Sequence, residues 1–140
     1  MQGHTGRQRI LLADDAQEVI DRVYRSLGSD FEIVGVARNG EQAVQFAQTL
    51  RADVLILDIS MPMLTGIQVA SQLRQFDGNP KIVFLTCHED SDYIDAAFSV
   101  GALGYVFKSR MAHDLVPAIE AALRGDKFMS QVQVHPLPTS

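Results

Sequence analysis

The sequence has little of what marks secreted, membrane-spanning or nucleic-acid-coating chains. Tryptophan is absent and Cys87 is the single cysteine, which excludes an intramolecular disulfide and favours the reducing cytoplasm. The longest apolar runs have the length of a strand, well short of the roughly 20 residues that a membrane helix needs. Lysines and arginines number 12 against 17 aspartates and glutamates, for a formal net charge of −5. This acidic balance argues against a basic surface for nucleic-acid phosphates, so any contact with DNA would need another domain.

The chain has the size of one compact domain. Its 140 residues are 46% hydrophobic, which is enough to bury one substantial core but leaves no room for a second full domain. The last stretch, residues 126–140, contains two prolines and no sustained periodicity. We predict that this stretch is a linker or a tail.

Five short apolar runs predict strands. Four of them show no polar alternation, which is typical of strands covered on both faces of a parallel sheet: residues 10–13, 54–57, 82–85 and 105–107. The fifth run, residues 31–37, alternates more and suits an edge of the sheet.

The segments between these runs have the apolar spacing of amphipathic helices. Boundary signals agree with this interpretation: Asn39 and Gly40 precede the second helix, Thr65 can cap the third, and Gly125 follows the fifth. Five strands that alternate with five helices predict a doubly wound α/β sheet, because right-handed crossovers place helices on both of its faces.

Polar residues with distinct chemistry stand where the predicted strands end. Asp14 and Asp15 follow the first strand, Asp58 follows the third, Thr86 follows the fourth and Lys108 follows the fifth. Ligands of such sheets bind outside the carboxyl ends of the strands. We therefore expect these five side chains to converge on one rim of the sheet.

The residue types at this rim suit a divalent cation and a phosphoryl group. Clustered carboxylates repel one another, and Mg²⁺ relieves that repulsion with an octahedron that phosphate oxygens commonly complete. Lys108 and Thr86 offer a positive charge and a hydrogen-bond donor for the oxygens of a transferring phosphoryl group. Aspartate attacks phosphorus to form an acyl phosphate, and Asp58, at the end of a central strand, is best placed to do so.

These residues lie in motifs that resemble a known family. The motifs are Leu-Ala-Asp14-Asp15, Leu-Asp58-Ile-Ser-Met61-Pro62 followed by Gly66, Leu-Thr86-Cys, and Gly-Tyr105-Val-Phe-Lys108. Their order and their placement at strand ends resemble the receiver domains of bacterial two-component response regulators, over residues 8–125. Residues 103–109 and 125–130 are similar to receivers of the NarL type, which a helix-turn-helix output domain normally follows.

The resemblance implies an acceptor and a set of metal ligands. Asp58 is expected to be the phosphoacceptor, and Asp15 and Asp58 are expected to bind Mg²⁺ or Mn²⁺ directly. Asp14 would act on the metal through water, and the backbone carbonyl of Ser60 would supply a further ligand.

The resemblance also implies a phosphoryl-binding pair and a switch. Thr86 and Lys108 would bind the phosphoryl oxygens. Tyr105 matches the position of the family's switch aromatic, whose inward rotation accompanies movement of Thr86. Tyr105 is also compatible with an ordinary half-buried strand aromatic. His88 either reaches over the acyl phosphate or is a plain loop histidine, and Cys87 is either a small hydrophobe or a reactive thiol.

We interpret the chain as a flavodoxin-like (βα)5 domain with the spatial strand order 2-1-3-4-5. Residues 1–7 would be an N-terminal extension, residues 8–125 the receiver, and residues 126–140 a linker or tail toward an output domain that is not present. The expected partners are a histidine kinase and a second copy of the chain, with DNA reached only through that output domain. The protein would be a cytoplasmic switch in transcription regulation and not a metabolic enzyme.

Two alternatives come from other functional classes. A phosphatase with an aspartyl-phosphate intermediate would want a second aspartate two residues after the nucleophile, where Ser60 stands. A stand-alone or phosphorylation-independent interaction module would have no reason to keep the whole set of acids.

Overall fold

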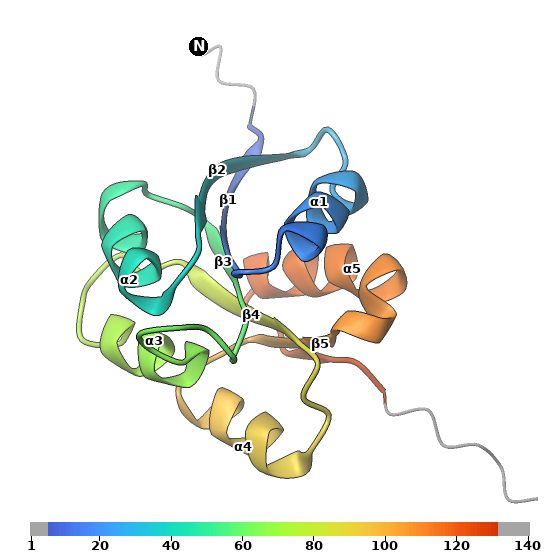
Figure 1. The fold of residues 1–140 in the computed structure, drawn as a ribbon. Coiled ribbons are helices and arrows are strands. Elements are labelled where there is room, and N and C mark those ends of the chain that lie inside the picture. The colour runs from blue at the N-terminus through green and yellow to red at the C-terminus, as the bar shows by residue number, and fades with distance from the viewer. Residues whose placement is uncertain (1–5, 132–140) are drawn as a thin grey trace, which may run out of the picture.

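A parallel β-sheet forms the centre of the molecule in the computed structural model, which describes residues 6–131 (Figure 1). Its strands are β1 (Gln8–Ala13), β2 (Phe31–Ala37), β3 (Val54–Leu57), β4 (Lys81–Thr86), β5 (Gly104–Phe107) and β6 (Phe128–Met129). They are hydrogen-bonded in the order β2-β1-β3-β4-β5-β6, and every pairing is parallel. The predicted fold and its strand order are confirmed, with a sixth strand added beside β5.

Helices cover both faces of the sheet (Figure 1). One face carries α1 (Gln17–Ser26) and α5 (Met111–Leu123), and the other carries α2 (Gly40–Thr49), α3 (Gly66–Leu73) and α4 (Ser91–Ser99). A 3-10 turn, η1 (Lys108–Arg110), joins β5 to α5. This arrangement brings the ends of β1, β3, β4 and β5 to one rim of the sheet.

The apolar runs form a core on each side of the sheet. Leu11 belongs to the cluster under α2, α3 and α4, whereas its neighbours Ile10 and Leu12 belong to the cluster under α1 and α5. All three side chains are fully buried, and burying each one contributes about 1.5–3 kcal/mol. Strand β2 lies at the edge, as predicted, and six of its seven residues are only partly buried.

The predicted helix boundaries are also present. Asn39 accepts a hydrogen bond from the backbone N–H of Gln42 at 2.8 Å, which caps α2. Thr65 and Gln68 form a reciprocal capping box at the start of α3. Gly125 follows α5 with a φ of +83°, a left-handed conformation that glycine adopts without strain.

Strand β6 is the main departure from the prediction, since residues 126–131 lack the periodicity from which a strand is predicted. Its two residues pair with Gly104 and Tyr105 of β5. The rest of the predicted tail, residues 132–140, and most of the predicted extension, residues 1–5, lie outside the described residues. Within residues 6–131, none of the helices is both long and apolar enough to cross a bilayer.

Candidate functional site

Three carboxylates meet at the rim where the central strands end. Asp14 and Asp15 directly follow β1, and Asp58 directly follows the neighbouring strand β3. One oxygen of each residue lies within 4.8 Å of the others. Asp14 and Asp58 are buried, with exposed fractions of 1% and 5%, whereas Asp15 is exposed. The cluster is therefore open to solvent on the side of Asp15.

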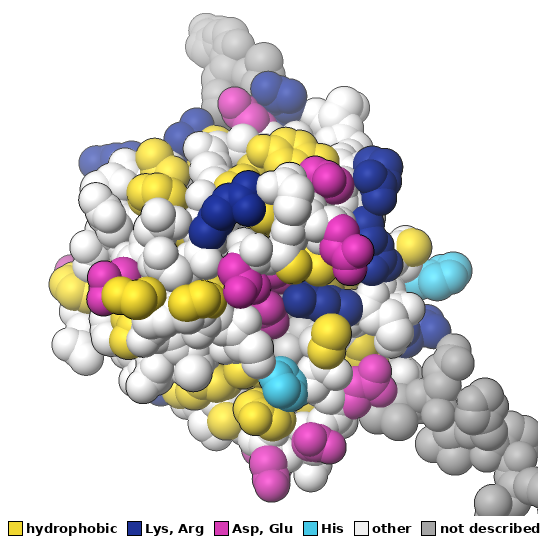
Figure 2. All heavy atoms as spheres, in the orientation of Figure 1, with side chains coloured by type: hydrophobic (Ala, Val, Ile, Leu, Met, Phe, Trp, Pro, Cys, Tyr) yellow, Lys and Arg dark blue, Asp and Glu magenta, His cyan; other side chains and the backbone are white. Residues whose placement is uncertain are grey.

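Lys108 brings a positive charge into this cluster from β5. Its Nζ lies 3.0 Å from Asp14 Oδ2 and 3.2 Å from Asp58 Oδ2. Lys108 is the first residue of η1, so its backbone is placed by the end of β5. Figure 2 shows acidic side chains beside a basic one near the middle of this face.

The backbone around Asp58 is held closely. Its N–H donates to the carbonyl of Ala13 at 3.0 Å. A Cβ atom at Gly66 would lie 2.2 Å from the carbonyl oxygen of Asp58, so only glycine permits α3 to begin this close to the strand end. This close approach explains the glycine that follows Met61-Pro62 in the motif.

Burial and charge shift the titration of the two central groups in a definite direction. Burial, followed by the neighbouring Asp14 carboxylate, raises the pKa of Asp58, and the opposing effect of Lys108 is smaller. Burial lowers the pKa of Lys108, but the charges of Asp58 and Asp14 outweigh it and raise that pKa overall. The ionised form of Asp58 therefore needs more positive charge than Lys108 supplies.

The carboxylate cluster suits a hard divalent cation. Asp14 Oδ1 accepts a hydrogen bond from the backbone N–H of Ala16 at 2.9 Å. Asp14 Oδ2 is buried, and Lys108 Nζ, 3.0 Å away, is its ion-pair partner. Three carboxylates that lie this close together are the oxygen donors that Mg²⁺ prefers, while exposed Asp15 leaves room for retained water.

Thr86 completes the set of predicted residues at this rim. It ends β4, next to β3, and is fully buried. Its Oγ1 accepts a hydrogen bond from the backbone N–H of His88 at 3.3 Å, which leaves the hydroxyl proton available for another acceptor. The strand ends thus assemble three acids, one ammonium group and one hydroxyl group.

Comparison with known proteins matches the region that contains these rim residues to a protein family. The family model of the response regulator receiver domain matches residues 10–120, which include every residue of the rim described above. The chain belongs to the response regulator receiver domain family.

Relatives of this receiver domain include NarL and a response regulator of the LuxR family. The transcriptional regulatory protein YxjL of Bacillus subtilis (strain 168) is 32% identical over 127 residues, which are 89% of this chain and 58% of that protein. NarL, the nitrate/nitrite response regulator of Escherichia coli (strain K12), is 31% identical over 133 residues, which are 94% of this chain and 62% of NarL. The chain therefore spans less than two thirds of the length of these relatives.

Solved structures show the same fold. A LuxR-family two-component response regulator from Aurantimonas sp. SI85-9A1 matches with a TM-score of 0.82 and 34% sequence identity. The match covers 87% of this chain and 89% of that chain. The receiver fold thus accounts for nearly all of the residues described above.

Tyr105 of the receiver domain is fully buried in the sheet, more deeply than the half-buried position considered for an ordinary strand aromatic. Its hydroxyl donates to the backbone carbonyl of His88 at 2.7 Å, and its ring packs against Phe84, Phe98 and Phe107. Burial, with Asp90 as the next cause, raises the pKa of Tyr105, so the phenol keeps its proton. The Tyr105 hydroxyl therefore connects β5 to the loop that follows Thr86, through the carbonyl of His88.

A contact between His88 and Ser60 is an addition that the sequence did not predict. The ring Nε2 of His88 lies 2.7 Å from Ser60 Oγ, and the ring stacks on Tyr93 at 4.1 Å between centroids. His88 lies two residues beyond Thr86 in the sequence. Ser60 is expected from the sequence to contribute only its backbone carbonyl, as a metal ligand. The structure links the loops after β3 and β4 through these two side chains.

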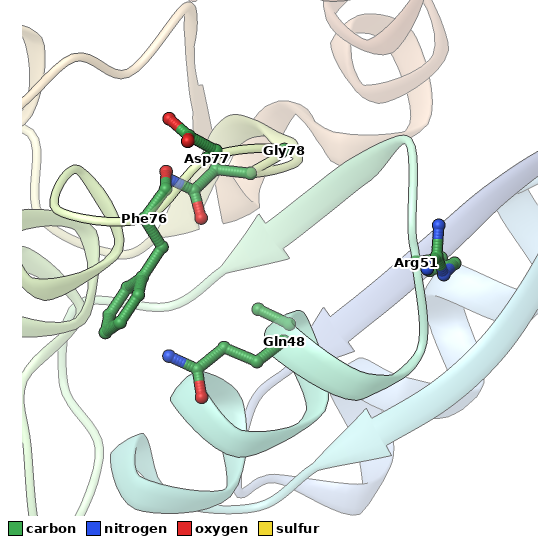
Figure 3. A pocket seen from close by; sticks show the side chains of 7 residues that line it. Gln48, Arg51, Phe76, Asp77 and Gly78 are labelled. Carbon is green, nitrogen blue, oxygen red and sulfur yellow. The ribbon is translucent and has the colours of Figure 1, made fainter.

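A hollow lies at the other end of the sheet, before β3 and β4 begin. It has a volume of about 480 Å³ and is lined by Ala47, Gln48, Arg51, Phe76, Asp77, Gly78 and Asn79. In Figure 3 the ring of Phe76 and the side chain of Gln48 lie on one side, with Arg51 apart from them. The hollow contains none of the clustered acids, so we assign the functional site to the carboxylate rim.

Proposed function

We propose that Asp58 accepts a phosphoryl group from the phosphohistidine of a histidine kinase, in a reaction that depends on Mg²⁺ or Mn²⁺. The observation that carries this proposal is the position of Asp58. It is buried, its carboxylate lies within 4.8 Å of Asp14 and Asp15, and one oxygen lies 3.2 Å from Lys108 Nζ. A nucleophile, a cation site and a fixed positive charge are thus adjacent.

The transfer step uses the residues of the rim in separate roles. An oxygen of the Asp58 carboxylate forms a bond to phosphorus while the bond between phosphorus and the donor nitrogen breaks, and the electron pair leaves with that nitrogen. Lys108 and Thr86 bind the equatorial oxygens of the phosphoryl group. The exposed face beside Asp15 gives the donor its entry.

A bound cation would neutralise the charge that the carboxylates and the phosphoryl group share. Asp15 and Asp58 would hold it directly, Asp14 would act through water, and the Ser60 backbone carbonyl would complete the protein ligands. Asp14 Oδ1 already accepts a hydrogen bond from the backbone N–H of Ala16, which agrees with an indirect role for Asp14 in binding the cation.

We further propose that phosphorylation controls transcription through a helix-turn-helix domain outside these residues. The relatives are transcriptional regulators, and the chain spans 58% of one and 62% of another. The cognate kinase and a second copy of the receiver would be its protein partners, and DNA would be reached only through the output domain. A cytoplasmic location and the role of a switch, with slow self-assisted hydrolysis, remain predictions.

Intact-mass measurement tests the acceptor chemistry directly. The chain is incubated with Mg²⁺ and either acetyl phosphate or phosphoramidate. We expect an added mass of one phosphoryl group that EDTA prevents. A wild-type chain that gains no mass with either donor would exclude phosphorylation by small donors and with it the proposed acceptor role.

A further inference from the structure

Ser130, just after β6, is joined to the end of β5 by its side chain. The residue is buried, with an exposed fraction of 1%. Its Oγ accepts a hydrogen bond from the backbone N–H of Phe107 at 3.2 Å and donates one to Asp114 Oδ2 at 2.6 Å. A residue beyond α5 therefore satisfies the backbone group directly before Lys108.

Asp114 joins the other end of the same turn. Its Oδ2 also accepts from Arg110 Nε at 3.1 Å, and Arg110 is the last residue of η1. The turn that carries Lys108 is thus fixed on both sides, through Phe107 before it and Arg110 at its end. Both connections pass through the Asp114–Ser130 pair.

Strand β6 has further backbone and side-chain contacts. The backbone N–H of Phe128 donates to the carbonyl of Leu103 at 2.8 Å, and that of Ser130 donates to the carbonyl of Tyr105 at 2.9 Å. Met129 packs against the core beside Tyr105, and Phe128 packs against the cluster under α1 and α5. Two residues of strand give little stability alone, so the buried hydroxyl of Ser130 adds to the contacts that hold β6 in place.

The geometry points to Ser130, acting with Asp114, as a positioning residue for Lys108. We infer that docking of β6 and binding of phosphoryl oxygens by Lys108 are energetically coupled through this pair. The inference rests on the proposed function of Asp58, because it needs a phosphoryl group at Lys108. Stabilisation by a fixed charge falls when that charge is misplaced by about an ångström.

Coupling of this kind acts in both directions. If docked β6 favours the binding position of Lys108, then a phosphoryl group held by Lys108 favours docked β6 by the same factor. Phosphorylation of Asp58 would thereby strengthen the attachment of the last element that the structure describes. The signal would leave the receiver along β6.

A labelling experiment compares Ser130→Ala with matched controls. Ser130→Ala leaves the Phe107 N–H without its partner, and we expect labelling by phosphoramidate to slow about threefold to tenfold, the range for loss of one buried hydrogen bond. Ile82→Val removes one buried methylene at the start of β4 and should cost comparable stability. It should label at the wild-type rate, as should Gln131→Ala at the exposed neighbour of Ser130.

Asp114→Asn tests whether the two residues act as one unit. It keeps the shape of the side chain and weakens the contacts to Ser130 and Arg110, so it should also slow labelling. The double variant should be no slower than the slower single variant, because both changes remove the same connection. Independent effects that multiply would contradict a shared path.

Hydrogen exchange tests whether a phosphoryl group at Lys108 strengthens the docking of β6. Beryllofluoride with Mg²⁺ serves as the phosphoryl mimic. In the wild type, exchange of the Phe128 and Ser130 amides should slow about threefold to tenfold on addition of the mimic, in line with the labelling effect. Ser130→Ala should lose this response. Unchanged β6 amides in the wild type, or Ser130→Ala labelling as fast as Ile82→Val, would overturn the inference while the wild type still labels. A wild type that does not label would overturn the proposed function first.

Discussion

Lys108 Nζ lies 3.2 Å from Asp58 Oδ2, although 50 residues of chain separate them. Lys108 directly follows β5 and Asp58 directly follows β3, and these two strands flank β4 in the sheet. Because parallel strands end at the same rim, this pairing follows from the strand order. It places a positive charge beside the Asp58 carboxylate, whose pKa is raised chiefly by burial.

Asp58→Asn should abolish labelling by phosphoramidate or acetyl phosphate. The amide keeps nearly the same shape but cannot attack phosphorus. Asp53→Asn is the matched control, because Asp53 precedes β3 at the opposite end of the same strand and accepts the backbone N–H of Arg9 at 2.8 Å. Intact mass should show one added phosphoryl group on the control and none on the variant. Full labelling of Asp58→Asn would refute the assignment of the acceptor.

Mg²⁺ should bind at the carboxylate cluster and be needed for labelling. Bound metal stabilises the folded state by mass action, by about 2.7 kcal/mol at a hundredfold excess over Kd. A thermal melt with and without Mg²⁺ should therefore show a higher Tm with the metal. Asp15→Ala should weaken binding more than Asp14→Ala, since of these two residues Asp15 is expected to bind the cation directly and Asp14 through water. Equal labelling in EDTA and in Mg²⁺ would contradict the mechanism.

Asp58→Asn should also stabilise the metal-free fold near neutral pH. A raised pKa means that the folded state holds the Asp58 proton more tightly than the unfolded state does. The stability that this proton contributes is present below the unfolded pKa and is lost as pH rises through the raised value. At pH 7 the ionised carboxylate therefore costs stability, and the uncharged amide removes that cost.

The measurement is Tm against pH without metal. The advantage of Asp58→Asn should be clear at pH 7 and should shrink as pH falls toward about 4, the ordinary aspartate value. Asp95→Asn, at an exposed position on α4, should stay close to the wild type throughout. An advantage for Asp58→Asn that is the same at both pH values would show that charge is not its cause.

Thr86→Ala should accept a phosphoryl group but transmit its arrival poorly. Phosphorylation adds roughly −1.5 to −2 charges at neutral pH, and the Thr86 hydroxyl is the donor expected to move toward them. Tyr105 donates to the backbone of His88, whose N–H in turn reaches Thr86 Oγ1. Amide NMR shifts around Tyr105 should therefore change less in the variant than in the wild type. Shift changes as large as those of the wild type would disprove this coupling.

Much of the site could be predicted because its residues follow strands with a strong pattern. Runs such as residues 54–57 are apolar throughout, so the sequence marks both the strand and the residue that follows it. Asp58 at the end of such a run has to emerge at the carboxyl rim of a parallel sheet. The strand order then brings it to Asp14 and Lys108 without further information.

What the sequence by itself determined was therefore the alternation of strands and helices in a doubly wound sheet and the identity of the residues at the rim, while the strand order came from the resemblance to receiver domains. Tertiary structure alone decided that β6 forms, because two residues carry no period and gain their stability from the edge of β5 and from contacts with α5. It also decided the partners of Ser130 and His88. No sequence pattern predicts which group a serine hydroxyl or a histidine imidazole will contact. The contacts of Ser130 with Asp114 and of His88 with Ser60 join residues 16 and 28 positions apart. Only packing against the sheet brings these residues together.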